Sequence, residues 1–127
     1  MFNVDGKTCT IVCRQGDTGM YVIEGLPTDE GMHNVEVFFS FYNSKRVIVG
    51  ELSATPVGDQ VTFFIPASIT DKLTVSPGAS TATYFYGIKL CYNDDENNEY
   101  EDTLLLGDKN VDEVNKVIVY PKIVEGY

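Results

Sequence analysis

Hydrophobic and polar residues alternate at a period of two along most of this chain, and that period is typical of half-buried β-strands. Turn-forming Gly, Pro, Asn, Asp or Ser residues separate the alternating segments. The predicted strands comprise residues 8–13, 21–23, 35–42, 47–52, 61–65, 81–92, 100–106 and 116–120. The pattern therefore predicts about eight strands, of which residues 81–92 form the longest.

Alternate side chains of a strand point to opposite faces of its sheet, so the apolar positions define the faces that should form the core. The expected core residues are Cys9, Ile11, Cys13, Tyr21, Ile23, Val35, Val37, Phe39, Phe41, Val61, Phe63, Ile65, Ala82, Tyr84, Tyr86, Ile88, Leu90 and Tyr92. Side chains at the positions between them are expected to face away from the core.

Pro66 breaks the strand pattern, and the residues after it follow a helical spacing. Ile69 and Leu73 lie four positions apart, which suits one to two helical turns. Residues 67–73 are therefore predicted to form a short crossover helix between two sheets. Because no other segment predicts a helix that could cover a sheet, we expect two antiparallel sheets packed face to face. The prediction is one all-β sandwich domain over residues 1–127, with a barrel as the second choice.

The segment Cys13–Gly19 ends one strand and begins the next. Gly16 and Gly19 permit a tight reversal, and Asp17 can accept a hydrogen bond from its own backbone two residues on. A strand rather than a helix follows these glycines, so they do not predict a phosphate-binding loop. We therefore interpret Arg14, Gly16, Asp17 and Gly19 as a structural turn.

Composition narrows the class of partner. A chain of 127 residues with 43% hydrophobic residues can bury a core without disulfide or metal staples. The net charge of −10, with nine scattered Lys and Arg residues, argues against nucleic acid or an anionic membrane surface as partner. No run approaches the roughly 20 apolar residues of a membrane span, and residues 1–7 lack the apolar segment of a secretory signal.

The three cysteines do not predict a disulfide. Cys9 and Cys13 are expected on one face of one strand, with Cα atoms about 13 Å apart, which is roughly twice the span of a disulfide. Cys91 lies within another predicted strand. We interpret all three as reduced, mostly buried thiols of a protein that folds in a reducing cytosol.

The acidic segment 94–102 is the only candidate for ion chemistry. Asp94, Asp95 and Glu96 are weak candidates for a metal site, because their spacing matches no calcium loop and no Gly provides the sharp turn. A solvated hairpin tip is the preferred interpretation. His33, the only histidine, is interpreted as a turn residue, and no catalytic or cofactor-binding residue is predicted.

Four aromatic residues fall at positions opposite the expected core faces. These are Phe38, Tyr42, Phe64 and Phe85. Aromatic side chains on the outer face of a sheet indicate a protein interface, unless both faces of that strand are covered within the domain.

Four short groups of residues resemble the N-terminal domain of phage baseplate upper proteins and related small tail proteins of phages of Gram-positive bacteria. These groups are 14–18, 61–66, 84–90 and 101–106. The resemblance implies an immunoglobulin-like antiparallel β-sandwich, made in the bacterial host cytoplasm and located in the virion. It carries no catalytic or ligand residue over to this chain. Proteins of that family continue into a helical or fibrous part, whereas this sequence stops at Tyr127, so a small accessory, decoration or fibre-associated subunit fits equally well.

The expected function is therefore that of a non-enzymatic phage or prophage structural protein. It would be a baseplate- or tail-associated or virion accessory subunit that assembles with other virion proteins and forms homo-oligomers, without a cofactor, nucleic acid or membrane. One alternative is a host-surface or glycan-binding module in which Tyr residues near a loop end stack on sugars. A second is a small hydrolase that uses Glu99 and Asp102 of the acidic hairpin.

Overall fold

The computed structural model describes residues 1–104 and 115–123, and most of these residues belong to β-strands. The strands are β1 (Phe2–Val4), β2 (Ile11–Arg14), β3 (Gly19–Ile23), β4 (His33–Tyr42), β5 (Ile48–Ala54), β6 (Val61–Ile65), β7 (Ala82–Asn93), β8 (Glu99–Leu104) and β9 (Asn115–Tyr120). One short helix, α1 (Ala67–Thr70), follows β6. All the predicted strands are present and β1 is an additional one. Positions 105 and 106 of one predicted strand lie outside the described residues.

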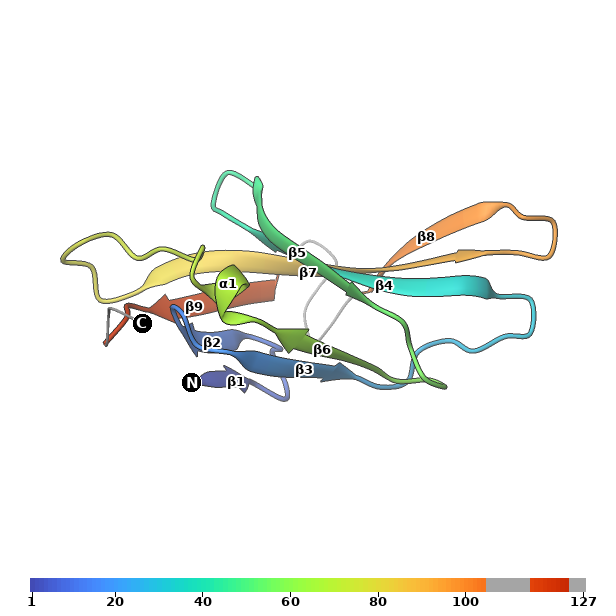
Figure 1. Ribbon diagram of the computed structural model, residues 1–127, viewed down its shortest axis with the longest axis horizontal. Helices are drawn as coiled ribbons and strands as arrows, with labels where there is room; N and C mark the ends of the chain where they lie inside the picture. The colour runs from blue at the N-terminus through green and yellow to red at the C-terminus, as the bar shows by residue number, and fades with distance from the viewer. Residues whose placement is uncertain (105–114, 124–127) are drawn as a thin grey trace.

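The strands form two layers (Figure 1). The large sheet has seven strands in the order β1-β2-β9-β7-β4-β5, with β8 also paired to β7. The small sheet consists of β3 and β6. The long strand β7 organises the large sheet, because its first half pairs with β9, its second half pairs with β8, and β4 runs along its other edge.

The prediction of a purely antiparallel sandwich is wrong for one pair of strands. β2 and β9 are parallel, and every other strand pair in the described residues is antiparallel. A parallel pair needs a long connection, and β2 and β9 are separated by most of the chain, so the topology permits this direction. Alternation along a strand specifies which face is buried, not the direction of its neighbour.

The connectivity is immunoglobulin-like. β3 and β6 pair as strands B and E do, and β4, β5, β7 and β9 lie together as C, C′, F and G do in a variable-type domain. The hydroxyl of Tyr84, near the start of β7, donates to the carbonyl oxygen of Thr74 at 2.8 Å, as in the tyrosine corner of such domains. The all-β sandwich is therefore confirmed, with a second sheet of two strands and with strand neighbours in the order that immunoglobulin domains have.

The centre of the core holds aromatic side chains where antibody domains have a disulfide. Tyr21 of β3 and Tyr86 of β7 face each other across the two layers, with their hydroxyl oxygens 2.7 Å apart. The Tyr86 hydroxyl also donates to the carbonyl oxygen of Cys9. Phe39 of β4 stacks on Tyr86, with ring centroids 5.1 Å apart, and its edge-on neighbours are Tyr21 and Phe63. These contacts join the two sheets without a covalent bond.

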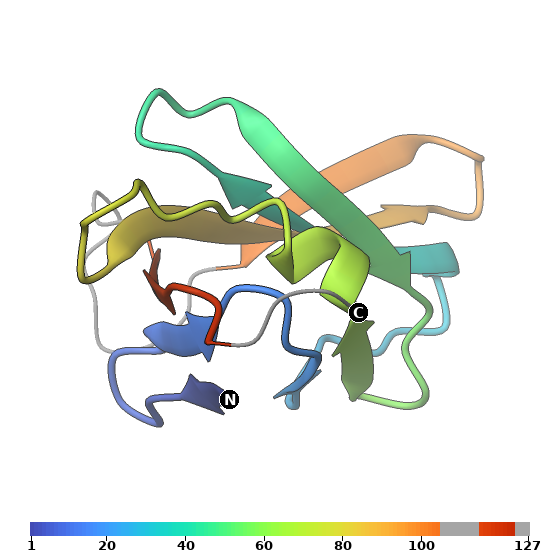
Figure 2. The ribbon, with the colours of Figure 1, turned by 60° about the vertical axis from the view of Figure 1, so that its left-hand side comes forward.

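The large sheet curls until its first and last strands approach the small sheet (Figure 2). β1 contacts β3 on one side, and β5 contacts β6 on the other, although no strand pairing crosses either seam in the described residues. A glycine lies at each seam. The Phe2 ring covers Gly19, and Ile69 of α1 covers Gly50. The fold is therefore a sandwich with closed sides rather than the alternative barrel.

Replacing Gly19 by alanine is expected to lower the free energy of unfolding by about 1 kcal/mol, because an added Cβ would lie 2.2 Å from the Phe2 Cγ atom and would displace that ring. Gly6 to alanine is the matched control, since a Cβ there meets no atom within 4 Å. Urea denaturation measures both changes. If Phe2→Ala removes the clash, the double variant Phe2→Ala, Gly19→Ala should lose less stability than the sum of the two single changes. Additive losses would contradict this account.

The helix α1 is shorter than the predicted segment 67–73, and it connects the small sheet to the large sheet as expected. Ile69 and Leu73 both point into the core, where Leu73 is completely buried. The i,i+4 spacing therefore identified the buried face correctly although the α-helix covers only four residues.

The predicted core faces are also confirmed for the strands, with one correction. Ile11 and Cys13 are completely buried, but Cys9 lies before β2 and has a φ of 58°. Cys9 therefore does not share a strand face with Cys13. Its backbone is held in this left-handed conformation by Asp5, whose carbonyl oxygen accepts the Cys9 N–H, and by the Tyr86 hydroxyl.

Candidate functional site

The four aromatic residues predicted to face outward lie on two opposite surfaces of the domain. Phe38, Tyr42 and Phe85 lie on the outer face of the large sheet, where each is half-buried. Phe64 lies on the outer face of the small sheet and is 73% exposed. All four residues therefore face outward as predicted, and Phe64 is the most exposed of them.

The outer face of the large sheet carries a groove between these rings. Ser40 and Gly87 are direct cross-strand partners, and their small side chains form its floor. On one side Phe38 pairs with Lys89, and on the other Tyr42 pairs with Phe85. The result is a row of small side chains between two rows of large ones, which we call the outer groove.

Tyr42 separates two hollows in the outer groove. The first, of about 380 Å³, contains Phe38, Ser40, Glu51, Lys89 and Glu101 among its lining side chains. The second, of about 390 Å³, is lined by Tyr42, Ser44, Arg46, Phe85, Tyr86 and Gly87. Tyr42 and Gly87 line both hollows.

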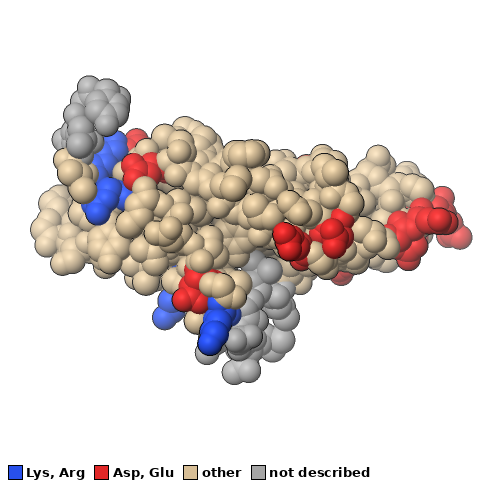
Figure 3. All heavy atoms as spheres, turned by 90° about the horizontal axis from the view of Figure 1, so that it is seen from below, with Lys and Arg blue, Asp and Glu red and all other residues tan. Residues whose placement is uncertain are grey.

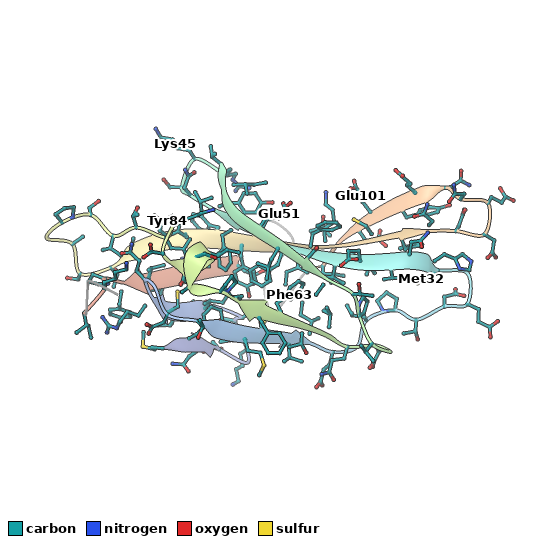
Figure 4. The ribbon with its side chains drawn as sticks, in the orientation of Figure 1. Met32, Lys45, Glu51, Phe63, Tyr84 and Glu101 are labelled. Carbon is teal, nitrogen blue, oxygen red and sulfur yellow. The ribbon has the colours of Figure 1, made fainter. Side chains whose placement is uncertain are left out.

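Polar side chains in the first hollow are fixed by hydrogen bonds. The Ser40 hydroxyl donates to Glu51 Oε2 at 2.7 Å, and Lys89 Nζ lies 3.8 Å from Glu101 Oε2. Figure 4 shows Glu51 and Glu101 on the side of the large sheet away from Phe63, which lies between the two layers. The groove therefore presents oriented hydroxyl and carboxylate groups beside aromatic rings.

The small sheet presents a second surface, which is apolar. Met20 and Phe64 are cross-strand partners and are 55% and 73% exposed, and Val22 next to them is 40% exposed. Figure 3, which views this side of the molecule, shows uncharged surface interrupted by several charged groups, with the densest group of acidic residues at one end. We call the surface of Met20, Val22 and Phe64 the apolar face.

The turn at Arg14–Gly19 is held by contacts to three other segments, around Met1, Thr70 and Pro121. Arg14 Nη1 donates to the Pro121 carbonyl oxygen at 2.7 Å, and the Asp17 carboxylate pairs with the amino group of Met1 at 2.5 Å. Gly16 has a φ of 88°, which favours glycine. The side chains of Arg14 and Asp17 thus bind neighbouring segments rather than each other, in keeping with the structural role expected for this turn.

The acidic hairpin is organised by Asp94. Its Oδ1 atom accepts the backbone N–H groups of Glu96 and Asn98, and its Oδ2 atom accepts the Tyr100 hydroxyl. Hydrogen bonds from Asn98 above all hold the Asp94 pKa below its usual range. Asp95 instead pairs with His33 at 2.7 Å. Within residues 1–104 and 115–123, no three potential metal ligands converge, so the weak metal candidates gain no support.

The carboxylates named for the hydrolase alternative do not face a common cleft. Glu99 and Asp102 are three residues apart in β8, so they point to opposite faces of the strand. His33 lies at the start of β4 and contacts Asp95 of the hairpin, so it ties two ends of strands together. Glu99 and Asp102 therefore do not act on one bond from a shared face of the strand.

The three cysteines are free, but only Cys13 is buried. Burial raises the pKa of the Cys13 thiol to about 11. Cys9 and Cys91 are partly exposed, which corrects the expectation that all three would be mostly buried. Cys91 lies on the outer face of β7, where its Sγ approaches Glu101 Oε1 at 3.9 Å.

Sequence reasoning did not identify the outer groove or the apolar face as units. Ser40 and Gly87 become partners only through the register of β4 and β7, and so do Met20 and Phe64 in β3 and β6. One signal was available in the sequence: Gly87 interrupts the longest alternating segment, and an interior strand glycine often marks a close approach.

No protein-family model, no curated protein and no solved structure matches this chain. Among the residues that the structure describes, no helix is long and apolar enough to span a membrane.

Proposed function

We propose that this chain is a non-enzymatic structural subunit of a phage or prophage virion, either baseplate- or tail-associated or accessory. It works by assembling with other virion proteins and with copies of itself. The observation that carries the proposal is the apolar face, because Met20 and Phe64 form a large exposed cross-strand pair and Phe64 is the most exposed aromatic side chain among the described residues.

Burial of this face would be favourable. A fully buried Met or Phe side chain contributes about 1.5–3 kcal/mol relative to an exposed one. On this side the acidic residues are densest at one end of the molecule, and smaller charged groups interrupt the uncharged surface nearer the centre (Figure 3). Apolar patches with a polar periphery are typical of protein interfaces.

The assignment to a virion rests on the resemblance to phage baseplate and tail proteins. The described residues of the groups that carry it fall in the turn before β3, in β6, in β7 and in β8, which ends at Leu104. The direct test is the genomic neighbourhood. Adjacent genes for a tail tape-measure or portal protein would support the proposal, and a locus without virion genes would contradict it.

Phe64→Asp is expected to abolish self-association through the apolar face, because a carboxylate would have to be desolvated in the interface. Gel filtration with light scattering should show a concentration-dependent oligomer for the unchanged protein and a monomer for the variant. Val57→Asp is the matched control. Val57 is 85% exposed in a turn, and its substitution adds the same charge away from the apolar face.

Two outcomes would contradict assembly through this face. One is a strict monomer at high concentration with no affinity for tail proteins of the same virion. The other is an oligomer that Phe64→Asp leaves unchanged. The circular dichroism spectrum of the variant should match that of the unchanged protein, because Phe64 is exposed and its removal creates no cavity.

A further inference from the structure

The floor of the outer groove is open at Gly87, although neither the packing nor the backbone there requires glycine. A Cβ at Gly87 would lie 3.7 Å from Tyr42 Cε2 and would meet no backbone atom within 4 Å, so a larger residue would fit there. Gly87 is not in a left-handed conformation, so its backbone does not need glycine either. The glycine keeps open the space in which the two hollows meet.

Recognition in this groove must come from side chains. Ser40 pairs with Glu51 on one side and with Gly87 on the other, so β4 has no free edge here. The residues on either side of Gly87 pair with Asn115 of β9 and Leu104 of β8. A peptide that adds as a strand needs a free edge, which this part of the sheet does not offer.

The groove is also close to electrically neutral. Lys89 and Arg46 balance Glu51 and Glu101, although the whole chain carries a charge of −10. The side chains alternate between aromatic rings and groups that donate or accept hydrogen bonds. This combination suits a ligand with flat apolar faces and a rim of hydroxyl groups, and it provides no excess charge for an ionic ligand.

We propose that the outer groove binds a neutral oligosaccharide, with one sugar ring in each hollow and the Tyr42 ring between them. Each hollow has a volume within the range of about 300–1,000 Å³ that is usual for small-ligand sites. Ser40, Glu51 and Lys89 bind hydroxyl groups of the sugar in the first hollow, and Arg46 binds those of the sugar in the second. The proposal concerns the sheet opposite the apolar face, so it does not depend on the proposed assembly.

Gly87→Val is the decisive variant. Valine favours strands, and its Cβ has ordinary contacts here, so the protein should fold with at least its original stability. The two methyl groups of the valine side chain would fill the floor of the outer groove where the two hollows meet. Thr83→Val is the matched control, because Thr83 is exposed four positions earlier on the same face of β7 and lines neither hollow.

The experiment screens the unchanged protein on an array of neutral and anionic oligosaccharides, and then measures the best neutral binder by calorimetry. We expect Gly87→Val and Tyr42→Ala each to weaken binding by about tenfold or more, because the alanine removes the aromatic contact between the two sugar rings and the valine adds a steric block. Thr83→Val and Phe64→Asp should bind as the unchanged protein does.

Three results would overturn the proposal: no neutral oligosaccharide bound by the unchanged protein, binding confined to anionic glycans, or equal affinity for Gly87→Val. Failure of the assembly proposal gives a different pattern. In that case Phe64→Asp leaves the oligomeric state unchanged, and Gly87→Val still weakens oligosaccharide binding.

Discussion

Replacement of Phe39 by alanine is expected to lower the free energy of unfolding by about 3–5 kcal/mol, which is the usual cost of truncating a buried Phe. Phe39 has no exposed surface, and its ring contacts those of Tyr21, Phe41, Phe63 and Tyr86. These partners come from β3, β4, β6 and β7, so the cavity would open between the two sheets. Domains of this size are commonly stable by only about 5–15 kcal/mol.

Urea denaturation followed by circular dichroism measures this loss. The comparison requires that the free energy of unfolding depends equally steeply on urea concentration in the variant and in the unchanged protein. Phe64→Ala is the matched control, because it removes the same ring from an exposed position and should change stability by less than about 0.5 kcal/mol. Similar losses for the two variants would show that Phe39 is not the centre of the core.

Tyr86→Phe is expected to destabilise the protein by about 1–3 kcal/mol, although it removes a single oxygen atom. The Tyr86 hydroxyl donates a hydrogen bond to the Cys9 carbonyl oxygen and shares a second one with the Tyr21 hydroxyl. Its loss therefore leaves the carbonyl and the Tyr21 hydroxyl without this partner inside the domain. Tyr92→Phe is the control in the same strand, since its hydroxyl makes no hydrogen bond within the described residues. Equal stability of the two variants would contradict the role of Tyr86.

The same network predicts sensitivity to alkaline pH. Burial raises the pKa of Tyr21 to about 12 and raises that of Tyr86 as well, above the value near 10 of an unfolded tyrosine. The folded state therefore holds both phenols neutral, and this contribution to stability is complete below pH 10 and is lost as the pH rises toward 12. Tyr86→Phe should reduce the loss of stability over this interval, as measured by urea denaturation at each pH. If the free energy of unfolding of Tyr86→Phe falls with pH as steeply as that of the unchanged protein, the account is contradicted.

The two proposed surfaces suit different partners because their chemistry differs. The apolar face offers exposed Met, Val and Phe side chains, which favours another protein surface. The outer groove offers rings together with oriented polar groups, which favours a hydroxylated ligand. They lie on opposite sheets, so one copy can use both at the same time.

The alternation of hydrophobic residues was sufficient to predict most of the fold. It placed Phe39, Phe63 and Ile88 in the core and located the crossover at α1, because burial of one strand face requires a period of two in the sequence. It did not predict β1, whose three residues are too few to show a period. It also placed Cys9 in a strand, because alternation cannot reveal a left-handed residue.

Prediction of the candidate sites was less complete. The sequence indicated Phe38, Tyr42, Phe64 and Phe85 as outward-facing, and each is on an outer sheet face. It could not show that three belong to one surface and the fourth to another, since that depends on which sheet each strand joins.

The sequence by itself determined which side chains are buried and where the chain turns, because those properties follow from local periodicity and from Gly, Pro, Asn and Asp at the turns. Only the tertiary structure decided the parallel pairing of β2 with β9, the link from Tyr21 through Tyr86 to Cys9, and the register that sets Ser40 beside Gly87. These are contacts between segments far apart in the chain, and no local pattern specifies which distant strand becomes a neighbour.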